Sequence, residues 1–170
     1  AERLMEEVVR VSGTNLEIAG ETIPLGKVGR LAVVGAGKAG AGMAVGLERT
    51  LGDVLPPDRR TGWINVPADC LRPTRWIHLH AGRPAGVNAP TPEGVAGTRQ
   101  ILRLVASLQT DDLCIVLLSG GGSALLTAPA TGITLEDKQT VTRLLSERGV
   151  SIEELNCVRR ELSEVKGGGL

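Results

Sequence analysis

The sequence LCIVLLSGGGSALL, residues 113–126, joins an apolar run directly to three consecutive glycines and then to a second apolar run. Residues 113–118 have the length and composition of a strand buried on both faces of a parallel sheet. The run after Ser123 predicts a helix. Consecutive glycines accept positive φ and leave backbone N–H groups open to an anion, toward which a helix N-terminus would also point. The stretch therefore predicts a strand, an anion-binding turn and a helix, in preference to a flexible surface turn.

A second strand–turn–helix pattern precedes residue 52. Residues 31–34 form a continuous apolar run, Gly35-Ala36-Gly37-Lys38-Ala39-Gly40 is a glycine turn, and an Ala- and Met-rich stretch predicts a helix to about Leu51. Further elements are expected as strands at 62–66 and 76–79 and as an amphipathic helix at 91–108. Alternating strands and helices predict an α/β fold with a doubly wound, mainly parallel sheet and flanking helices.

The two ends of the chain differ from this central pattern. Apolar residues at helical spacing predict a helix over 1–11, and residues 16–25 predict two short strands. Helix-start patterns at 134–137 and 151–154 predict two helices that end near residues 148 and 163. The chain then reaches a glycine turn at 167–169, which normally leads into another element. We therefore expect this chain to be a fragment of a longer protein.

Composition and charge exclude several classes of function. With 170 residues, 42% of them hydrophobic, the chain can form one α/β domain. It has no Phe or Tyr and only Trp63 and Trp76 as aromatic residues, which argues against base stacking on aromatic platforms. The 19 basic and 19 acidic residues cancel, which argues against partners such as nucleic acid or an anionic membrane.

Cysteine spacing and hydropathy indicate the compartment. Cys70, Cys114 and Cys157 are widely spaced and form no metal-ligand or disulfide pattern, so reduced thiols are expected. The amino-terminal residues lack an apolar signal segment, and the run at 113–118 is far too short to span a bilayer. These features predict a cytoplasmic protein.

The turn at 35–40 formally matches GxGxxG, the pattern of dinucleotide-binding turns. A nicotinamide site also needs an acidic residue at the end of the next strand, and here Pro67 and Ala68 precede Asp69. The pattern is not a Walker A loop either, because Ala39 follows Lys38 where Ser or Thr is required. What remains is a lysine beside glycines at a helix N-terminus. Such a lysine is suited to bind a phosphoryl or carboxylate oxygen. The alternative is that Lys38 is an ordinary solvated residue on the first turn of the helix.

Other polar residues carry weaker signals. Asn156 and Arg159 would share one helix face at i, i+3 and could hold a carboxylate or phosphate, although a solvated helix surface has the same spacing. His78 and His80 alternate along an expected strand, but two histidines without a third ligand make a weak metal site. Ser123 lacks the GxSxG setting of a nucleophile elbow.

Three ordered motifs together resemble the amino-terminal part of the glycerate 2-kinases. They are the stretches Val33–Ala39, Leu118–Leu125 and Glu154–Leu170. The resemblance spans nearly the whole chain. It implies that residues 1–170 are an incomplete, Rossmann-like amino-terminal domain of a two-domain enzyme, with the active site in the cleft between the domains.

The resemblance also implies roles for individual residues. Lys38 corresponds to the catalytic lysine that acts on substrate and transferring phosphate, and no residue is implied as a metal ligand. The implied cofactor-binding residues are Gly35, Gly37, Ser119, Gly120, Gly121, Gly122 and Ser123, and the implied substrate-binding residues are Asn156, Arg159 and Lys166. The sequence departs from the family at Ala81-Gly82-Arg83-Pro84, where Gly-His-Pro is typical. No role is therefore carried over to Arg83.

The implied activity is phosphoryl transfer from ATP to the 2-hydroxyl of D-glycerate, giving 2-phosphoglycerate and ADP, with ATP and Mg²⁺ as cofactors. Glycerate and nucleotide are the implied partners, and a homodimer is a possible assembly. We expect the fragment alone to be inactive, because half of the cleft lies outside it. Two alternatives stay open. One is an NAD(P)H-dependent hydroxypyruvate reductase that holds a pyrophosphate at 35–40, and the other is a non-catalytic module that binds phosphate ligands.

Overall fold

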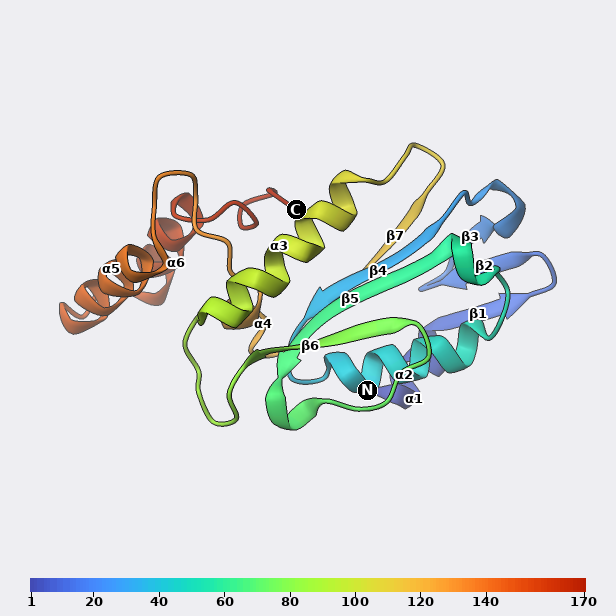
Figure 1. Cartoon of the computed structure of the whole chain (residues 1–170), viewed down its shortest axis with the longest axis horizontal. Coiled ribbons are helices and arrows are strands. Elements are labelled where there is room, and N and C mark those ends of the chain that lie inside the picture. The colour runs from blue at the N-terminus through green and yellow to red at the C-terminus, as the bar shows by residue number, and fades with distance from the viewer.

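The computed structural model describes all 170 residues, and its centre is a four-stranded sheet (Figure 1). The strands are β4 (Leu31–Ala36), β5 (Arg60–Pro67), β6 (Ile77–Arg83) and β7 (Leu113–Leu118). They lie in the order β6-β5-β4-β7, and each neighbouring pair is parallel. The predicted α/β fold with a parallel sheet is confirmed. The carboxyl ends of all four strands consequently meet at one edge of the sheet.

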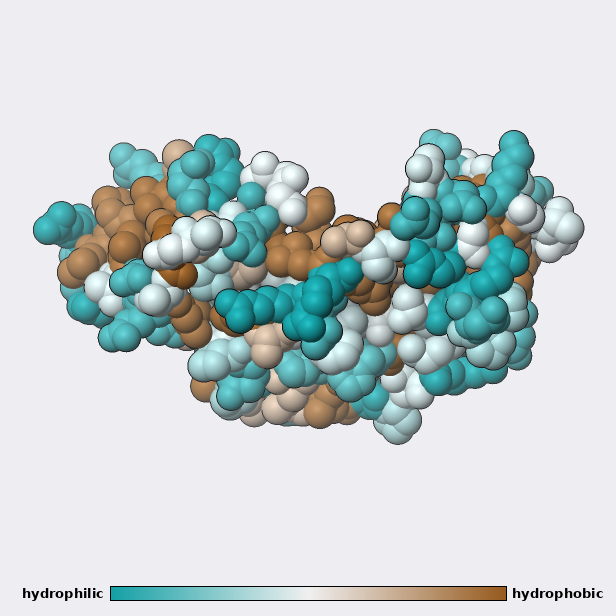
Figure 2. Space-filling model, turned by 45° about the horizontal axis from the view of Figure 1, so that its top comes forward, coloured by the Kyte–Doolittle hydropathy of each residue, from teal (hydrophilic) through white to brown (hydrophobic).

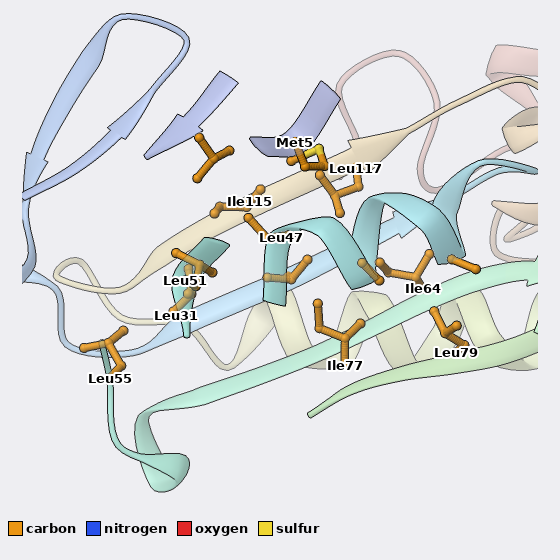
Figure 3. Close-up of a cluster of buried hydrophobic side chains, with 14 of the residues drawn as sticks. Met5, Leu31, Leu47, Leu51, Leu55, Ile64, Ile77, Leu79, Ile115 and Leu117 are labelled. Carbon is orange, nitrogen blue, oxygen red and sulfur yellow. The ribbon is translucent and has the colours of Figure 1, made fainter. Parts of the chain in front are cut away.

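Two crossover helices cover the sheet. Helix α2 (Gly40–Leu51) connects β4 to β5, and α3 (Pro92–Ala106) connects β6 to β7. Figure 3 shows α2 on one face of the strands and α3 behind them, as in a doubly wound sheet. From β4 the chain proceeds outward through β5 and β6 and then returns to the other side of β4 as β7. Ligands of such folds bind where the strand order reverses, and here that place is the carboxyl ends of β4 and β7.

The first residues form a separate small unit. It contains α1 (Glu2–Val8) and the antiparallel strands β1 (Val9–Ser12), β2 (Asn15–Ile18) and β3 (Glu21–Pro24). The predicted helix over 1–11 is wrong after Val8. There Val9 and Val11 alternate along a strand, a pattern that β-branched residues favour, and Gly13 with φ 58° reverses the chain into β2.

The main core lies between this unit, α2 and the sheet (Figure 3). Its 17 buried residues are Leu, Ile, Val, Ala and Met, which agrees with the lack of Phe and Tyr. Helix α1 approaches α2 closely because Gly46 has no side chain. A Cβ at Gly46 would lie 2.6 Å from the Glu2 carbonyl oxygen.

The last part of the chain projects from the carboxyl edge of the sheet as a helical arm (Figure 1). After the single turn α4 (Gly122–Leu125), the arm consists of α5 (Leu135–Glu147) and α6 (Ile152–Glu161). Both helices begin at the predicted positions with complete capping boxes, formed by Thr134 with Asp137 and by Ser151 with Glu154. Residues 162–166 then return toward α4, where Glu164 N–H donates to the Ala128 carbonyl at 3.0 Å.

Some large apolar side chains stay exposed. Val116 and Leu118 on the edge strand β7 are 45% and 57% exposed, and Leu144 and Ile152 on the arm are also exposed. Figure 2 shows apolar surface on the arm and in the hollow between the arm and the rest of the molecule. None of the helices combines the length and apolar character that a membrane crossing requires.

Candidate functional site

Two glycine turns meet at the point where the strand order reverses. The turn after β4 is bonded to the loop after β7, since Lys38 N–H donates to the Gly120 carbonyl at 2.9 Å and Ala39 N–H donates to Ser119 Oγ at 3.0 Å. Ser119 N–H in turn donates to the Ala36 carbonyl at 3.2 Å. Segments that lie about 80 residues apart in the sequence therefore form one hydrogen-bonded pair of loops.

The two turns differ in how many backbone donors they leave open. In the first turn Gly37 N–H donates to the Asn65 carbonyl and Gly40 N–H to the Gly37 carbonyl, both at 3.1 Å. With Lys38 and Ala39 also bonded to the second loop, residues 37–40 have no N–H group left for a ligand. The N–H groups of Gly120 and Gly121 have no acceptor within the chain. Open backbone donors are thus found at 120–121, as predicted, but not at 37–40.

The predicted cofactor-binding glycines have different local roles. Gly35 lies inside β4, where a Cβ would overlap the Leu117 carbonyl oxygen. Gly37 has φ 142° and faces Ser119, and Gly121 has φ 84°, so both use backbone conformations that favour glycine. A Cβ at Gly122 would lie 3.1 Å from the Ala36 carbonyl oxygen, whereas one at Gly120 would meet nothing within 4 Å. Close packing thus explains most of these glycines, and Gly120 alone faces open space.

The structure brings Ser123 together with two of the predicted substrate-binding residues. Arg159 Nη2 donates to Ser123 Oγ at 2.8 Å, and Lys166 Nζ donates to the same oxygen at 2.9 Å. A hydroxyl oxygen has two lone pairs and can accept both bonds. Asn156 does not reach Ser123 itself, but its Oδ1 accepts from Arg159 Nη1 at 3.4 Å. Ser123 of the glycine loop therefore accepts hydrogen bonds from two cations near the end of the chain.

Lys138 belongs to this cluster, although no sequence pattern indicated it. Its side chain is 2% exposed, and Nζ donates to the carbonyls of Leu162 at 2.9 Å and Arg159 at 3.4 Å. A lysine on α5 thus caps the carboxyl end of α6 and holds Arg159 in place. Lys138, Arg159, Ser123 and Gly121 line a cavity of about 410 Å³.

Burial, together with the charges of Lys166 and Arg159, lowers the pKa of Lys138 to about 8. Burial and the charge of Arg159 also lower the pKa of Lys166. An anion in this cavity would favour the charged ammonium forms and would raise both pKa values again. Anion binding near pH 8 should therefore be accompanied by proton uptake.

We expect sulfate, which does not titrate between pH 6 and 9, to bind this chain with an affinity that falls by up to roughly tenfold from pH 7 to pH 9. The affinity falls as the pH rises because Lys138 is mostly charged below pH 8 and mostly neutral above it. Calorimetry in two buffers of different ionisation enthalpy, at pH 8, measures the expected proton uptake. An affinity independent of pH, with no proton taken up, would contradict the assignment of this cavity to anions.

A second cationic cluster lies on the other side of Gly121. Its members are Lys38, which is exposed, and Arg83 at the end of β6, which is only 3% exposed. A Cβ built on Gly121 would lie 3.1 Å from Arg83 Nη2 and 3.4 Å from Lys38 Cγ, so both side chains converge on the glycine loop. They line a cavity of about 230 Å³ that shares Asn88 with the larger one. The sequence analysis carried no role over to Arg83, because residues 81–84 depart from the family pattern. The place of Arg83 beside the loop after β7 is visible only in the structure.

None of these five cations has a carboxylate partner. The nine ion pairs of the chain involve neither Lys38 and Arg83 nor Lys138, Arg159 and Lys166. Such a group of unpaired cations, with the open N–H groups of Gly120 and Gly121, suits a ligand with several negative charges. The arrangement can position and neutralise phosphate or carboxylate groups.

The histidine pair lies elsewhere, and no metal cluster is present. His78 and His80 share a face with Trp63, whose ring centroid lies 4.1 Å and 5.4 Å from theirs. His80 Nε2 lies 2.9 Å from the Glu93 carbonyl oxygen. No group of three His, Cys, Asp or Glu side chains in the chain could hold a metal ion.

The chain is similar to several known proteins. The model of a family described as "Domain of unknown function (DUF4147)" matches residues 1–170. The glycerate kinase of Rattus norvegicus is 40% identical over 172 residues, which cover 94% of this chain and 31% of that protein. The glycerate kinase of Homo sapiens is 42% identical over 153 residues, covering 82% and 28%. A putative hydroxypyruvate reductase of Agrobacterium vitis is 40% identical over 148 residues, covering 84% and 35%.

Two solved structures share the fold. The PH0495 protein of Pyrococcus horikoshii superposes with a TM-score of 0.87 at 30% identity, covering 99% of this chain and 36% of that chain. A glycerate kinase of Thermotoga maritima superposes with a TM-score of 0.73 at 35% identity, covering 84% and 33%. The chain therefore spans about a third of the length of the relatives that it matches.

Proposed function

The chain belongs to the DUF4147 domain family, and we propose that the protein that carries it is an ATP-dependent glycerate 2-kinase. It transfers the γ-phosphoryl group of ATP to the 2-hydroxyl of D-glycerate and gives 2-phosphoglycerate and ADP. The observation that carries this proposal is the group of five unpaired cations around the glycine loop, at the carboxyl ends of β4 and β7. The substrate, glycerate, is taken from the names of the relatives, which are glycerate kinases.

The chemistry of phosphoryl transfer fits these residues. The reaction depends on positioning and on neutralising charge that spreads over the phosphoryl oxygens, and it needs little covalent chemistry from the protein. Open backbone donors at Gly120 and Gly121 and the hydroxyl of Ser123 suit the nucleotide phosphates. Lys38 lies on the other side of Gly121 and is the proposed catalytic residue. Its ammonium would stabilise the negative charge on the transferring group.

Arg159 and Lys166 are proposed to bind the phosphoryl group that substrate and nucleotide share during transfer. This role explains why residues that the resemblance assigns to the substrate donate to Ser123, which it assigns to the cofactor. Asn156 supports Arg159 through its amide oxygen. In this scheme Lys138 does not touch the reacting atoms but positions Arg159 by capping α6.

The residues present do not form a Mg²⁺ site by themselves. Mg²⁺ in phosphoryl-transfer sites uses one or two carboxylates together with phosphate oxygens and water. Asp69 is the one carboxylate that lines the Lys38–Arg83 cavity, and the chain has no cluster of three possible ligands. We therefore assign no step to a metal held by this chain, and the proposed Mg²⁺ would enter with the nucleotide.

The proposed protein has two domains and acts in the cytoplasm. Because relatives are about three times as long as this chain, residues of a second domain are proposed to close the cleft above the glycine loop. Exposed apolar side chains on β7 and on the arm give such a domain a surface to pack against. A homodimer is the proposed assembly.

A reductase is the second candidate, because some relatives are named putative hydroxypyruvate reductases. Asp69 lines the cavities beside Lys38, so an acidic residue does lie near the glycine turn. A dinucleotide pyrophosphate, however, needs free N–H groups at that turn. Those of residues 37–40 already donate to acceptors within the chain, which favours the kinase.

The test is an assay of the enzyme that carries these residues. It is incubated with D-glycerate and Mg-ATP, and enolase is then added without a mutase. Formation of phosphoenolpyruvate shows that 2-phosphoglycerate was made and supports both the kinase and the position of transfer. If no phosphoenolpyruvate forms while hydroxypyruvate drives NAD(P)H oxidation, the protein is a reductase and the kinase assignment is wrong. Ligand binding without either turnover would indicate a non-catalytic module.

A further inference from the structure

Arg83 is held in an unusual way for a buried cation. Its side chain is 3% exposed, and Nη1 donates to Asn88 Oδ1 at 2.8 Å and to the Val87 carbonyl. These two bonds tie the loop after β6 to the end of the strand and fix the plane of the guanidinium. Nε is buried without an acceptor, and Nη2 makes no hydrogen bond within the chain. A buried charge without a counter-ion is costly, so the free edge of this guanidinium is suited to an anionic ligand.

Lys38 contributes a second cation to the same cavity. Its ammonium makes no hydrogen bond or ion pair, and the aliphatic part of its side chain lies against Gly121, as does Arg83 Nη2. The one carboxylate in the lining, Asp69, is exposed and pairs with neither cation. Two cations that converge without a counter-ion repel each other, and an anion between them would remove that repulsion.

The size of the cavity and the shape of the guanidinium favour a small carboxylic acid as the ligand. At about 230 Å³ the cavity is smaller than the roughly 300–1,000 Å³ of pockets that hold drug-sized ligands. Its volume suits a small acid, whereas the phosphates of a nucleotide have the larger adjacent cavity of about 410 Å³ beside Ser123 and Arg159. A planar guanidinium with a free edge matches the two oxygens of a carboxylate.

We propose that Arg83 binds the carboxylate of the hydroxy-acid substrate. Lys38 then lies between that carboxylate and the phosphoryl group, and the small cavity selects a short acid. This assignment rests on the proposed function, because it divides the two cavities between the acid and the nucleotide.

The experiment measures steady-state kinetics of Arg83→Gln in the enzyme that carries this chain. We expect the KM for D-glycerate to rise by about 10- to 100-fold, while the KM for ATP stays within about twofold, because one charge-assisted contact with the acid is lost. Calorimetric titration of D-glycerate without ATP should show the same loss of affinity. Arg103→Gln, which removes an exposed arginine from α3, should change neither constant.

Two further variants separate binding from folding. Arg83→Lys keeps the charge but loses the planar pair of donors, and should raise the KM for D-glycerate less than Arg83→Gln does. Asn88→Ala removes a partner of Arg83 but leaves Nη2 in place, so it should have a smaller effect than Arg83→Gln. Thermal unfolding of each variant shows whether the fold is kept. If Arg83→Gln does not fold, the kinetics of Arg83→Lys test the proposal instead. An unchanged KM for D-glycerate in Arg83→Lys then overturns it.

The outcomes also distinguish this proposal from the proposed function. A KM change for ATP instead of D-glycerate, or no change in either, overturns the role of Arg83 while the kinase stands. A wild-type enzyme without ATP-dependent turnover overturns the kinase. In that case D-glycerate binding still tests the role of Arg83. Weaker binding by Arg83→Gln than by the wild type supports this role, and the absence of binding by the wild type overturns it.

Discussion

Lys38→Ala is expected to lower the kcat of the proposed glycerate phosphorylation by about 100- to 1,000-fold. Loss of one preorganised donor at the place where charge develops typically costs about 3–4 kcal/mol of transition-state stabilisation. The side chain of Lys38 lies against Gly121 of the glycine loop, and its ammonium has no carboxylate partner. The measurement is steady-state turnover of the enzyme that carries this chain, with saturating D-glycerate and Mg-ATP.

Two controls accompany this variant. Lys38→Arg keeps the charge but not the compact ammonium, and should recover only part of the activity. Lys27→Ala removes another exposed lysine, one that lies in a short helical turn before the amino end of β4, whereas the site lies at the carboxyl end of that strand, and should leave kcat unchanged. Turnover of Lys38→Ala near the wild-type value, in a folded protein, would show that Lys38 is an ordinary solvated residue.

Gly35→Ala is expected to destabilise the fold by more than about 4 kcal/mol, or to prevent folding. A Cβ at this position would overlap the Leu117 carbonyl oxygen and lie 2.9 Å from the carbonyl carbon. Gly35 and Leu117 are paired across β4 and β7, so the two central strands would have to separate. Strained overpacking of this kind is one of the few mechanisms that produce such large effects. Denaturant unfolding followed by circular dichroism measures the change.

Gly120→Ala is the matched control. Gly120 belongs to the neighbouring loop, but a Cβ there would meet nothing within 4 Å and its φ is not in the positive range. We expect its free energy of unfolding to change by less than about 1 kcal/mol. A loss of less than about 1 kcal/mol in Gly35→Ala would mean that β4 and β7 can shift apart without cost, contrary to the packing described above.

Much of the candidate site could be predicted from local patterns. Glycines that follow apolar strands identified the turns at 35–40 and 119–123, and the positive φ of Gly37 and Gly121 agrees with that prediction. The same patterns did not show that the first turn uses its own N–H groups to hold the second. The hydrogen bonds between the two turns depend on β4 and β7 being neighbours, and this strand pairing joins residues about 80 positions apart.

Arg83 and Lys138 could not have been found in this way. Arg83 is the last residue of β6, an edge strand of the sheet, and the sequence around it departs from the family motif. Lys138 has the spacing of any residue on an amphipathic helix, and its importance comes from the carboxyl end of α6 that it caps. In both cases the functional signal is a contact between distant segments.

The sequence by itself determined the local elements of this protein. Apolar runs, glycine turns and capping boxes depend on neighbouring residues, so the individual strands of the central sheet, the two turns and the starts of α5 and α6 follow from short patterns. Only the tertiary structure decided which cations surround the glycine loop. Arg159 and Lys166 reach Ser123 across 36 and 43 residues because the helical arm folds back onto α4. No local spacing encodes that return, since it depends on how the elements pack together.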